Sequence, residues 1–356
     1  MKILHLIGSS GTGGAERHLI DLCRQQAAMG LDVAVALPTR GTLGRTLQSL
    51  GIDCFFIRPG GRWNLLALWS LRQAIRRAAP DLIHAHMVKS AIMAQRAGSG
   101  VPCVATAHNL VRRCGPFRGC RRVICVSAQV RDTLTACGYP PDHSLVVPNA
   151  IDFSLLSNRP RAAERERMGW AQQPVVLCVA RLVPAKGHVF LLHAMAHVWQ
   201  QFPAARLVLA GEGPERAALE QLAARLQATA QVDFLGNRDD VPQLLGAADV
   251  YVQPSIKEGF GIALLEAMAS ALPCIATPTG AMGEMIETGH TGLLVAPGDA
   301  DELAQAILKL LADAPLRQQL AAHASETVRS RYSQARQGDA TLAVYRQAMQ
   351  AACESR

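Results

Sequence analysis

The chain has 356 residues, of which 49% are hydrophobic, 18% are charged and 4% are aromatic, and its formal net charge is +8. This length is too great for one ordinary core and fits two domains, and the composition excludes a disordered chain. The first apolar run, in MKILHLIGSSG, is too short for a signal peptide, and no run reaches the roughly 20 apolar residues of a membrane span. We therefore expect a cytoplasmic protein.

The positive charge lies in the first half of the chain. Residues 1–157 hold 18 Lys and Arg against 8 Asp and Glu, whereas residues 158–356 hold 18 against 20. A cationic half predicts an anionic partner, which could be lipid, a phosphorylated acceptor or nucleic acid. The ten cysteines include no CxxC pair and fit no zinc pattern, so we interpret them as reduced thiols and expect no metal site.

Taken in chain order, short apolar runs alternate with amphipathic stretches. A strand at Lys2–Ile7 leads through a glycine-rich turn to a helix from about Ala15 to Met29, and a second strand follows at Asp32–Pro38. The runs CFFIRP, DLIHAHM, PCVATAHN, RVICVS and SLVVPN are further predicted strands. Strands that are apolar on both faces and alternate with helices predict a parallel α/β sheet.

The alternation pauses after Asp152, where SLLSNRPRAAERERMGW predicts a linker running into a helix. It restarts with PVVLCVA, RLVLAGEG, QVDFLGN, DVYVQPS, PCIATPTG and GLLVAPG, and the chain is helical in pattern from Asp301. We predict an α/β fold with two doubly wound Rossmann-like domains, residues 1–157 and 158–335, facing a central cleft. A C-terminal helix at about 336–356 is expected to pack back on the first domain. Ligands of such sheets bind beyond the carboxyl ends of the strands, where every motif below falls.

Three turns follow predicted strands. GSSGTGGAER (Gly8–Arg17) is neither a P-loop nor a dinucleotide fingerprint, and it fits either a plain turn or an anion-binding helix N-terminus. In ARLVPAKGH, Arg181 and Lys186 suit a diphosphate, because charge-assisted hydrogen bonds are worth about 1.5–3 kcal/mol each, although an isolated pair would equally fit a solvated surface. GEGPER (Gly211–Arg216) by itself indicates only a strand end and a helix start.

The most informative segment is EGFGIALLE, from Glu258 to Glu266. Its glycines let the backbone approach a ligand, and a helix from about Ile262 to Ala271 would offer its N-terminal N–H groups to a phosphate. The carboxylate of Glu266 can accept hydrogen bonds from a ribose diol. Its neighbours are apolar, and a Glu in such a helix is expected to be paired or bound, because unpaired burial is costly.

This segment resembles the E-x7-E donor signature of the retaining GT-B glycosyltransferases of family 4 (group 1). Five other segments resemble that family's motifs and follow the same order, namely GGAER, the His108–Asn109 pair, VPNAID, ARLVPAKG and GEGPER, with TGLLV as its last strand. Ala271 and Ala150 stand where the family often has glycine. The resemblance covers the chain to about residue 335 and implies transfer from a nucleotide sugar, with UDP more usual than GDP or ADP, and with retention at the anomeric carbon.

The resemblance also implies residue roles. Glu258 and His108 would contact the transferred sugar near the reacting carbon, and Glu266 would bind the ribose. The diphosphate would be held by Arg181, Lys186, Gly13, Gly14, Phe260, Gly261 and Ile262. The positive charges of Arg181 and Lys186, together with the helix dipole, would stabilise the negative charge that develops on the leaving diphosphate. No DxD segment appears at a strand end near the site, so neither a metal nor another cofactor is required.

Two basic stretches predict where the acceptor binds. Arg62–Pro80 is amphipathic, with Trp63 and Trp69 on its apolar side, and Arg112–Arg122 holds five arginines in eleven residues, including Arg112, Arg113, Arg121 and Arg122. Either stretch could be ordinary core packing or solvated loop. An interfacial helix and a basic loop also suit an anionic membrane face, so we expect peripheral association with the inner face of the cytoplasmic membrane and a lipid-linked or anionic glycan acceptor, as in cell-surface polysaccharide or lipopolysaccharide biosynthesis.

Two other functions remain open from the sequence. A sugar-nucleotide 2-epimerase would share the fold and the nucleotide site, although the E-x7-E spacing disfavours it. A nucleic-acid-binding protein would explain the isoelectric point of about 9.2, but the chain has no aromatic platform or known binding motif, so we expect no nucleic acid partner.

Overall fold

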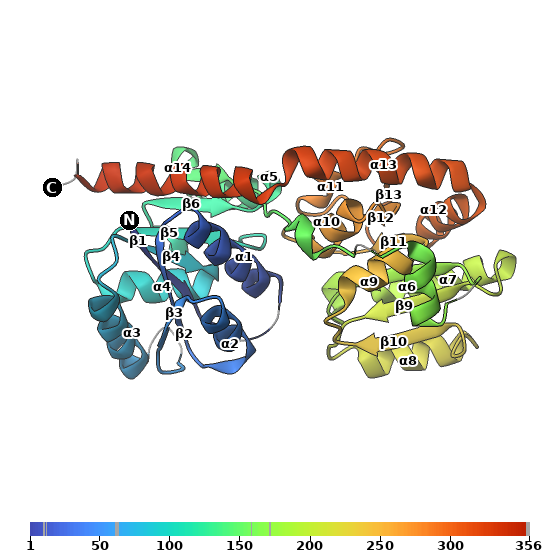
Figure 1. The fold of residues 1–356 in the computed structure, drawn as a ribbon, viewed down its shortest axis with the longest axis horizontal. Helices are drawn as coiled ribbons and strands as arrows, with labels where there is room; N and C mark the ends of the chain where they lie inside the picture. Colours follow the sequence, from blue (N-terminus) through green and yellow to red (C-terminus); the bar gives the residue numbers. More distant parts are fainter. Residues whose placement is uncertain (10, 12, 61–63, 158, 171, 354–356) are drawn as a thin grey trace. The chain divides into compact units, whose positions relative to one another are not determined.

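In a computed structural model, the structure describes residues 1–9, 11, 13–60, 64–157, 159–170 and 172–353, with side chains to residue 350. The chain divides into two compact units, residues 1–150 with 334–356, and residues 151–333 (Figure 1). Each unit is a parallel sheet covered by helices, as the alternation in the sequence predicted.

The first unit contains a seven-stranded parallel sheet with the spatial order β3-β2-β1-β4-β5-β6-β7. Its strands are β1 (Lys2–Ile7), β2 (Asp32–Leu37), β3 (Asp53–Phe56), β4 (Leu82–His86), β5 (Cys103–Ala107), β6 (Arg122–Cys125) and β7 (Ser144–Val146). Every residue of β4 and β5 is buried, as expected for central strands of a parallel sheet that is covered on both faces. The strand order reverses at the β1–β4 pair, so the segments that leave these two strands begin side by side.

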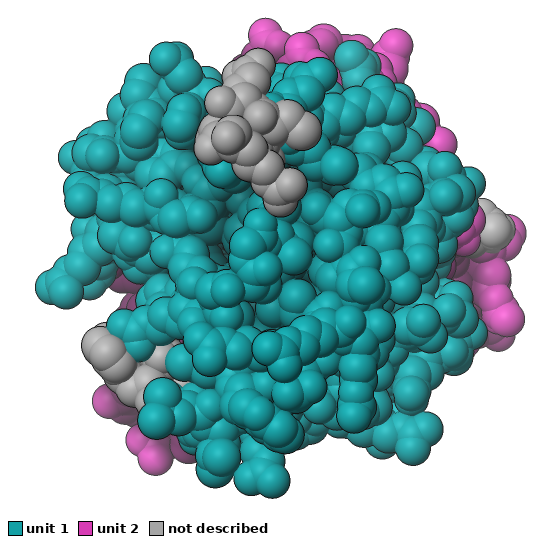
Figure 2. Space-filling view, turned by 90° about the vertical axis from the view of Figure 1, so that its left-hand side faces the viewer, with its two compact units in different colours: residues 1–150, 334–356 teal, residues 151–333 magenta. Residues whose placement is uncertain are grey.

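The helices of the first unit include one from the far end of the chain. They are α1 (Gly14–Ala28), α2 (Gly41–Ser49), α3 (Leu65–Ala78), α4 (Met87–Ala97), η1 (Gly115–Phe117), α5 (Ala128–Ala136), η2 (Pro141–His143) and α14 (Gln334–Cys353). Helix α14 packs on α1 and along β5 and β6 (Figure 1), and Figure 2 shows its residues within the same unit as residues 1–150. Val344, Tyr345 and Ala348 are buried in the core that contains Ile3 and Leu82, so this helix completes the first unit.

The second unit contains a six-stranded parallel sheet with the order β10-β9-β8-β11-β12-β13, which reverses at the β8–β11 pair. Its strands are β8 (Val175–Val179), β9 (Arg206–Ala210), β10 (Val232–Gly236), β11 (Val250–Gln253), β12 (Cys274–Ala276) and β13 (Leu293–Leu294). Its helices are η3 (Phe153–Leu155), α6 (Arg161–Met168), η4 (Pro184–Lys186), α7 (His188–Gln201), α8 (Arg216–Arg225), α9 (Val241–Ala247), α10 (Ile262–Ala269), α11 (Met282–Met285), α12 (Ala300–Ala312) and α13 (Ala314–Arg331).

The units meet in the chain at residues 150 and 151, seven residues before the boundary that we predicted from composition. The backbone N–H of Ile151 donates to the carbonyl of Tyr332 at 3.1 Å, and Ile151 forms a β-bridge with Ser333. The polar segment that begins at Ile151 is therefore fixed to the second unit by backbone pairing, which composition does not reveal. The chain returns to the first unit at residue 334 rather than 336.

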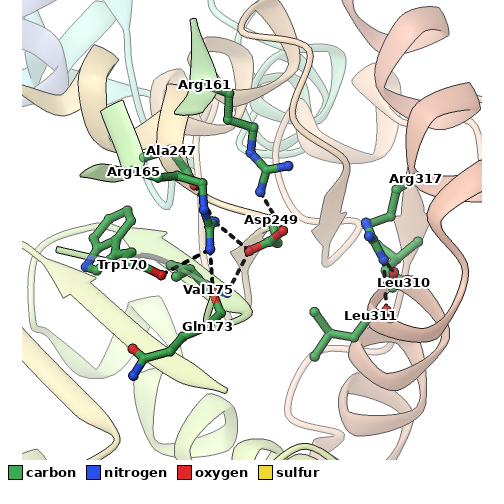
Figure 3. A network of polar contacts seen from close by, with 10 residues as sticks. All are labelled: Arg161, Arg165, Trp170, Gln173, Val175, Ala247, Asp249, Leu310, Leu311 and Arg317. Atoms are coloured by element: carbon green, nitrogen blue, oxygen red, sulfur yellow. Dashed lines mark hydrogen bonds and ion pairs between the residues drawn. The ribbon is translucent and has the colours of Figure 1, made fainter. Parts of the chain in front are cut away.

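The predicted linker runs into helix α6, as the sequence indicated, and this helix is anchored by partly buried polar contacts (Figure 3). The guanidinium of Arg165 donates to Asp249 at 3.0 Å and to the carbonyls of Ala247, Trp170 and Gln173 at 2.9, 3.2 and 2.6 Å. Asp249 also accepts from the backbone of Val175 at 2.9 Å. These contacts tie α6 to the starts of β8 and β11, so α6 belongs to the frame of the second unit.

Candidate functional site

The predicted donor residues lie where the strand order of the second sheet reverses. The segments after β8 and β11 are joined by backbone hydrogen bonds, because Ile256 and Lys257 both donate to the carbonyl of Ala185, at 2.8 and 3.1 Å. Gly187 makes this approach possible, since a Cβ there would lie 2.0 Å from the carbonyl oxygen of Pro254. The two segments therefore form one continuous backbone surface at the carboxyl edge of the sheet.

An ion pair between Lys186 and Glu258 connects the two segments. Lys186 ends η4, and Glu258 lies in the segment between β11 and α10; their side chains are 20% and 13% exposed. The carboxylate of Glu258 also accepts a hydrogen bond of 3.1 Å from the backbone of Gly259. The sequence assigned Lys186 to the diphosphate and Glu258 to the transferred sugar, and in the structure these two side chains contact each other directly. Both can therefore reach a common ligand.

The segment that carries Arg181 is held in place by the GEGPER turn. The backbone N–H of Leu182 donates to Glu212, and that of Glu215 donates to Leu182, both at 3.0 Å. A Cβ on Gly213 would lie 2.2 Å from the carbonyl oxygen of Leu182, so only glycine permits this contact. Arg181 itself is exposed. GEGPER therefore does more than end a strand, because it positions the segment of the predicted diphosphate clamp.

The N-terminus of helix α10 lies in the same segment as Glu258. Its cap residue Gly261 has φ +95° and no side-chain cap, and an added Cβ would lie 2.9 Å from the Met282 side chain. Phe260 is buried, with its ring 6.1 Å from that of Tyr332, so its side chain anchors the segment and only its backbone is available to a ligand. The first-turn N–H groups of a helix attract anions. This geometry suits the phosphate role that we predicted for residues 260–262.

Glu266 lies on the second turn of α10 and is 7% exposed, in an otherwise buried stretch. The helix ends at Ala269, two residues earlier than we predicted from the sequence. Ala271 follows in the left-handed region with φ +53°. Glycine adopts that region without strain, so the conformation would suit glycine better than alanine.

The turn after β1 in the first unit is organised around Glu16. This carboxylate is buried at the start of α1 and accepts a hydrogen bond from Ser9. Gly13 caps α1, and a Cβ there would lie 2.9 Å from the Glu16 carboxylate; Gly14 is the first residue of the helix. Residues 10 and 12 of this turn lie outside the described part of the chain. A Cβ at position 13 would thus require the Glu16 carboxylate to shift, while the φ of −85° is one that any residue adopts.

His108 follows β5 and belongs to a group of five buried or half-buried histidines, which we refer to as the histidine cluster: His5, His18, His84, His86 and His108. Nδ1 of His86 lies 3.4 Å from Nε2 of His108, and the rings of His18 and His108 are 4.9 Å apart. Burial lowers the pKa of His5 and that of His108 to about 4, and it lowers the pKa of the other three well below 6.5. The five rings are therefore neutral at physiological pH.

The sequence analysis missed four members of this cluster. His84 and His86 are two residues apart on β4 and so face the same side of the sheet, and His5 pairs with His84 across the β1–β4 ladder. The alternation in LIHAH was the available signal. Two triplets, His5/His84/His86 and His18/His86/His108, bring ligand nitrogens within 4.8 Å of one another and could in principle hold a transition metal.

The predicted basic acceptor loop is only partly exposed. Arg112 and Arg113 are exposed, but Arg121 and Arg122 are half-buried, and Nη1 of Arg122 donates to the Arg121 carbonyl at 2.9 Å. Arg122 already belongs to β6, which places its backbone in the sheet. Arg121 and Arg122 are therefore less accessible than Arg112 and Arg113, and the acceptor or membrane role of the four arginines stays a prediction.

Helix α3 presents apolar side chains to the surface. Leu65, Leu66 and Trp69 are 79%, 56% and 57% exposed, whereas the opposite side of the helix is buried. Arg76 and Arg77 are exposed in its last turn. Trp63, which we assigned to the same surface, lies outside the described residues. Among the helices that the structure describes, none combines the length and the apolar character needed to cross a membrane.

Comparison with known proteins gives matches along nearly the whole chain. Residues 12–155 match the profile of Glycosyltransferase Family 4, and residues 160–327 match that of Glycosyl transferases group 1. The phosphatidyl-myo-inositol mannosyltransferase of Mycobacterium leprae is 31% identical, over 89% of this chain and 88% of its own. The lipopolysaccharide core biosynthesis glycosyltransferase LpsE of Rhizobium meliloti is 29% identical, over 96% and 98%. Crystal structures of HepE from Anabaena, one with UDP and glucose and another with UDP-glucose, are also similar; the first superposes with a TM-score of 0.88 at 27% identity, covering 97% of this chain and 99% of HepE.

Proposed function

We propose that this chain, which belongs to the group 1 glycosyltransferases of family 4, transfers a sugar from a UDP-sugar to an anionic or lipid-linked glycan with retention at the anomeric carbon. Its GT-B fold and its glycosyltransferase class follow from the family. UDP is supported by the HepE complexes with UDP and UDP-glucose. A role in cell-surface polysaccharide or lipopolysaccharide biosynthesis is supported by the similarity to LpsE.

The observation that carries the donor proposal is the convergence of Lys186, Glu258 and the α10 N-terminus on one edge of the second sheet. In our proposal, the diphosphate binds to Lys186, Arg181 and the N–H groups of residues 260–262, with Gly13 and Gly14 lining it, and Glu266 accepts hydrogen bonds from the ribose. Binding of the diphosphate would move the Lys186 side chain away from Glu258. The Glu258 carboxylate would then accept hydrogen bonds from hydroxyl groups of the transferred sugar, and His108 would lie near the reacting carbon.

The proposed chemistry requires stabilisation of negative charge on the leaving diphosphate. As the sugar–phosphate bond breaks, the two cationic side chains and the helix N–H groups stabilise that charge without reorganisation. The acceptor hydroxyl attacks from the face that the leaving group vacates, which gives retention. We propose that these groups make a metal ion unnecessary, so turnover should persist in EDTA.

Binding of nucleotide sugars tests the donor site. Lys186→Ala should weaken UDP binding by about 10- to 100-fold, because it removes charge-assisted hydrogen bonds worth about 1.5–3 kcal/mol. Lys257→Ala removes the same charge from an exposed neighbour and should have little effect. Glu266→Gln should reduce binding of UDP-glucose, and Glu326→Gln, on the exposed side of α13, is its control. Equal affinities within either matched pair would refute the assignment.

A screen of UDP-, GDP- and ADP-sugars by thermal shift identifies the nucleotide, since a ligand at 100 times its Kd stabilises the protein by about 2.7 kcal/mol. Product analysis with the donor alone separates transfer from 2-epimerisation. A glycosyltransferase leaves the configuration of the donor sugar unchanged apart from slow hydrolysis, whereas an epimerase inverts the configuration at C2, whether the sugar stays on UDP or is released by hydrolysis. Formation of an epimer would overturn the proposed reaction.

For the acceptor side, we propose that α3 and the basic loop hold the first unit on an anionic membrane at the cytoplasmic face. Support comes from the exposed apolar surface of Leu65, Leu66 and Trp69 on the same helix as Arg76 and Arg77. Each cation near an anionic surface contributes about 1 kcal/mol. Sedimentation with phosphatidylglycerol liposomes should fall for Trp69→Ser and for the double change Arg112→Glu and Arg113→Glu. Val189→Ser, on an exposed residue of the second unit, serves as the control.

A further inference from the structure

The histidine cluster is connected by a chain of hydrogen bonds that extends well beyond the residues assigned to the reaction. It runs from Tyr345 on α14 through Gln26 on α1, His5 on β1 and His86 on β4 to His108. Most of these side chains are fully buried, and the chain crosses the core of the first unit. Burial of so many polar groups is costly unless each is satisfied, so their arrangement needs an explanation.

The direction of each hydrogen bond follows from the atoms involved. Gln26 Nε2 donates to the Tyr345 hydroxyl at 2.9 Å, and Gln26 Oε1 faces His5 Nε2 at 2.8 Å. Because an amide oxygen can only accept, His5 carries its proton on Nε2. The Tyr345 hydroxyl, which accepts from Gln26, gives its own proton to His84 Nδ1 at 2.6 Å, and His84 Nε2 then donates to Thr106 Oγ1 at 2.6 Å.

A neutral imidazole has one donor and one acceptor nitrogen, so this direction propagates along the chain. His5 Nδ1 must accept, and its partner His86 Nε2, 3.0 Å away, must donate. His86 Nδ1 is then an acceptor, and at 3.4 Å it faces His108 Nε2, which must donate. Burial keeps the rings neutral at physiological pH. No ring therefore carries two protons, and the alternation of donor and acceptor nitrogens continues along the whole chain of hydrogen bonds.

We propose that Gln26 and Tyr345 are positioning residues, which fix His108 in the tautomer that carries its proton on Nε2 and leaves Nδ1 as a hydrogen-bond acceptor. A fixed acceptor recognises a hydroxyl group of a bound sugar and excludes the alternative in which His108 donates. The part of this inference that concerns the substrate rests on the proposed function, whereas the tautomer itself is a property of the ligand-free protein.

The tautomer can be measured without substrate. Long-range ¹H–¹⁵N correlation spectra of protein labelled with ¹⁵N-histidine distinguish a protonated Nε2 from a protonated Nδ1 in each ring, and His108→Gln identifies the His108 signals. We expect a single Nε2-protonated form of His108 in the wild type. A single Nδ1-protonated form would mean that the whole chain runs in the opposite direction and would overturn the proposal.

Tyr345→Phe tests the far end of the chain. It removes the hydroxyl that Gln26 and His84 share but keeps the ring, which lies edge-on to His84. We expect the His108 signals to show a mixture of tautomers. Tyr139→Phe is the matched control, because that hydroxyl donates to the backbone carbonyl of Cys120 in the same unit, and the change should leave the His108 signals unchanged. Unchanged His108 signals in Tyr345→Phe would overturn the proposal.

Kinetics and metal analysis complete the test. Tyr345→Phe should raise KM for the sugar substrate by up to about tenfold, the equivalent of one hydrogen bond, and leave kcat little changed, because the contact exists before and during reaction. In the His108→Gln background the same change should have no further effect on KM.

Stoichiometric Zn²⁺ in protein purified without chelator would overturn the proposal, since a metal on His18, His86 and His108 would occupy the nitrogens that the chain uses. If the wild-type protein showed the expected tautomer of His108 but no transfer activity, the proposed function would be refuted and the tautomer inference would stand.

Discussion

Replacing Gly187 by alanine tests how closely the two donor segments approach each other. Gly187 has φ +71°, and a Cβ there would lie 2.0 Å from the carbonyl oxygen and 3.0 Å from the carbonyl carbon of Pro254. Gly169 is the matched position, because it lies in the same unit with φ +68° and no described atom lies within 4 Å of its added Cβ. The two substitutions therefore share the backbone strain and differ only in the collision.

The shared strain has a modest cost. A left-handed alanine costs about 1–2 kcal/mol, and the stiffer unfolded chain returns about 0.4–1 kcal/mol, so Gly169→Ala should lower the free energy of unfolding by about 1 kcal/mol. At position 187 the Cβ must move by about 1.4 Å to reach an ordinary contact, which forces the backbone apart at an additional cost of about 1–3 kcal/mol. Gly187→Ala should therefore lose about 2–4 kcal/mol.

Urea unfolding, followed by the fluorescence of Trp170 and Trp199 in the second unit, measures this difference. Because a two-unit chain need not unfold in one step, the midpoint shifts of the two variants are compared directly. Gly187→Ala should also weaken UDP binding, since Lys186 is the adjacent residue. Equal midpoints for the two variants would show that the segments do not approach as closely as the structure indicates.

Three further predictions concern stability. Acidification from pH 7 to pH 5 should destabilise the protein, because the pKa of His5 is about 4 in the folded protein and about 6.5 in the unfolded chain. The contribution of His5 to the free energy of unfolding is complete above pH 6.5 and falls by about 2 kcal/mol at pH 5. A flat Tm over this range would contradict the neutral cluster. Ala271→Gly should raise the urea midpoint slightly, by about 0.5 kcal/mol, because it relieves the left-handed φ of an exposed residue; a lowered midpoint would contradict this. Arg165→Met should cost about 3 kcal/mol, because it leaves the half-buried Asp249 without its main partner and three backbone carbonyls without their donor, whereas the exposed Arg161→Met should cost under about 1 kcal/mol. Similar losses would contradict the contacts of Figure 3.

The sequence by itself determined the class of fold and predicted the edge of each sheet at which a ligand binds. Apolar runs of strand length identify buried parallel strands, because such strands are covered on both faces. Turn glycines and charged residues after those runs identify the ligand edge, because parallel strands all end at that edge. Lys186 and Glu258 could therefore be predicted to lie at that edge without coordinates, whereas their roles and that of Glu266 were predicted from the family resemblance.

Only the tertiary structure decided which strand ends are neighbours. Residues 186 and 258 form an ion pair because β8 lies beside β11, an order that no local pattern specifies. Likewise, α14 completes the first unit and brings Tyr345 to Gln26 across more than 300 residues of sequence. Ile151 falls within the first predicted domain but pairs with Ser333 of the second unit. Strand order and backbone pairing across long separations depend on the packing of the whole chain, so composition and periodicity alone cannot reveal them.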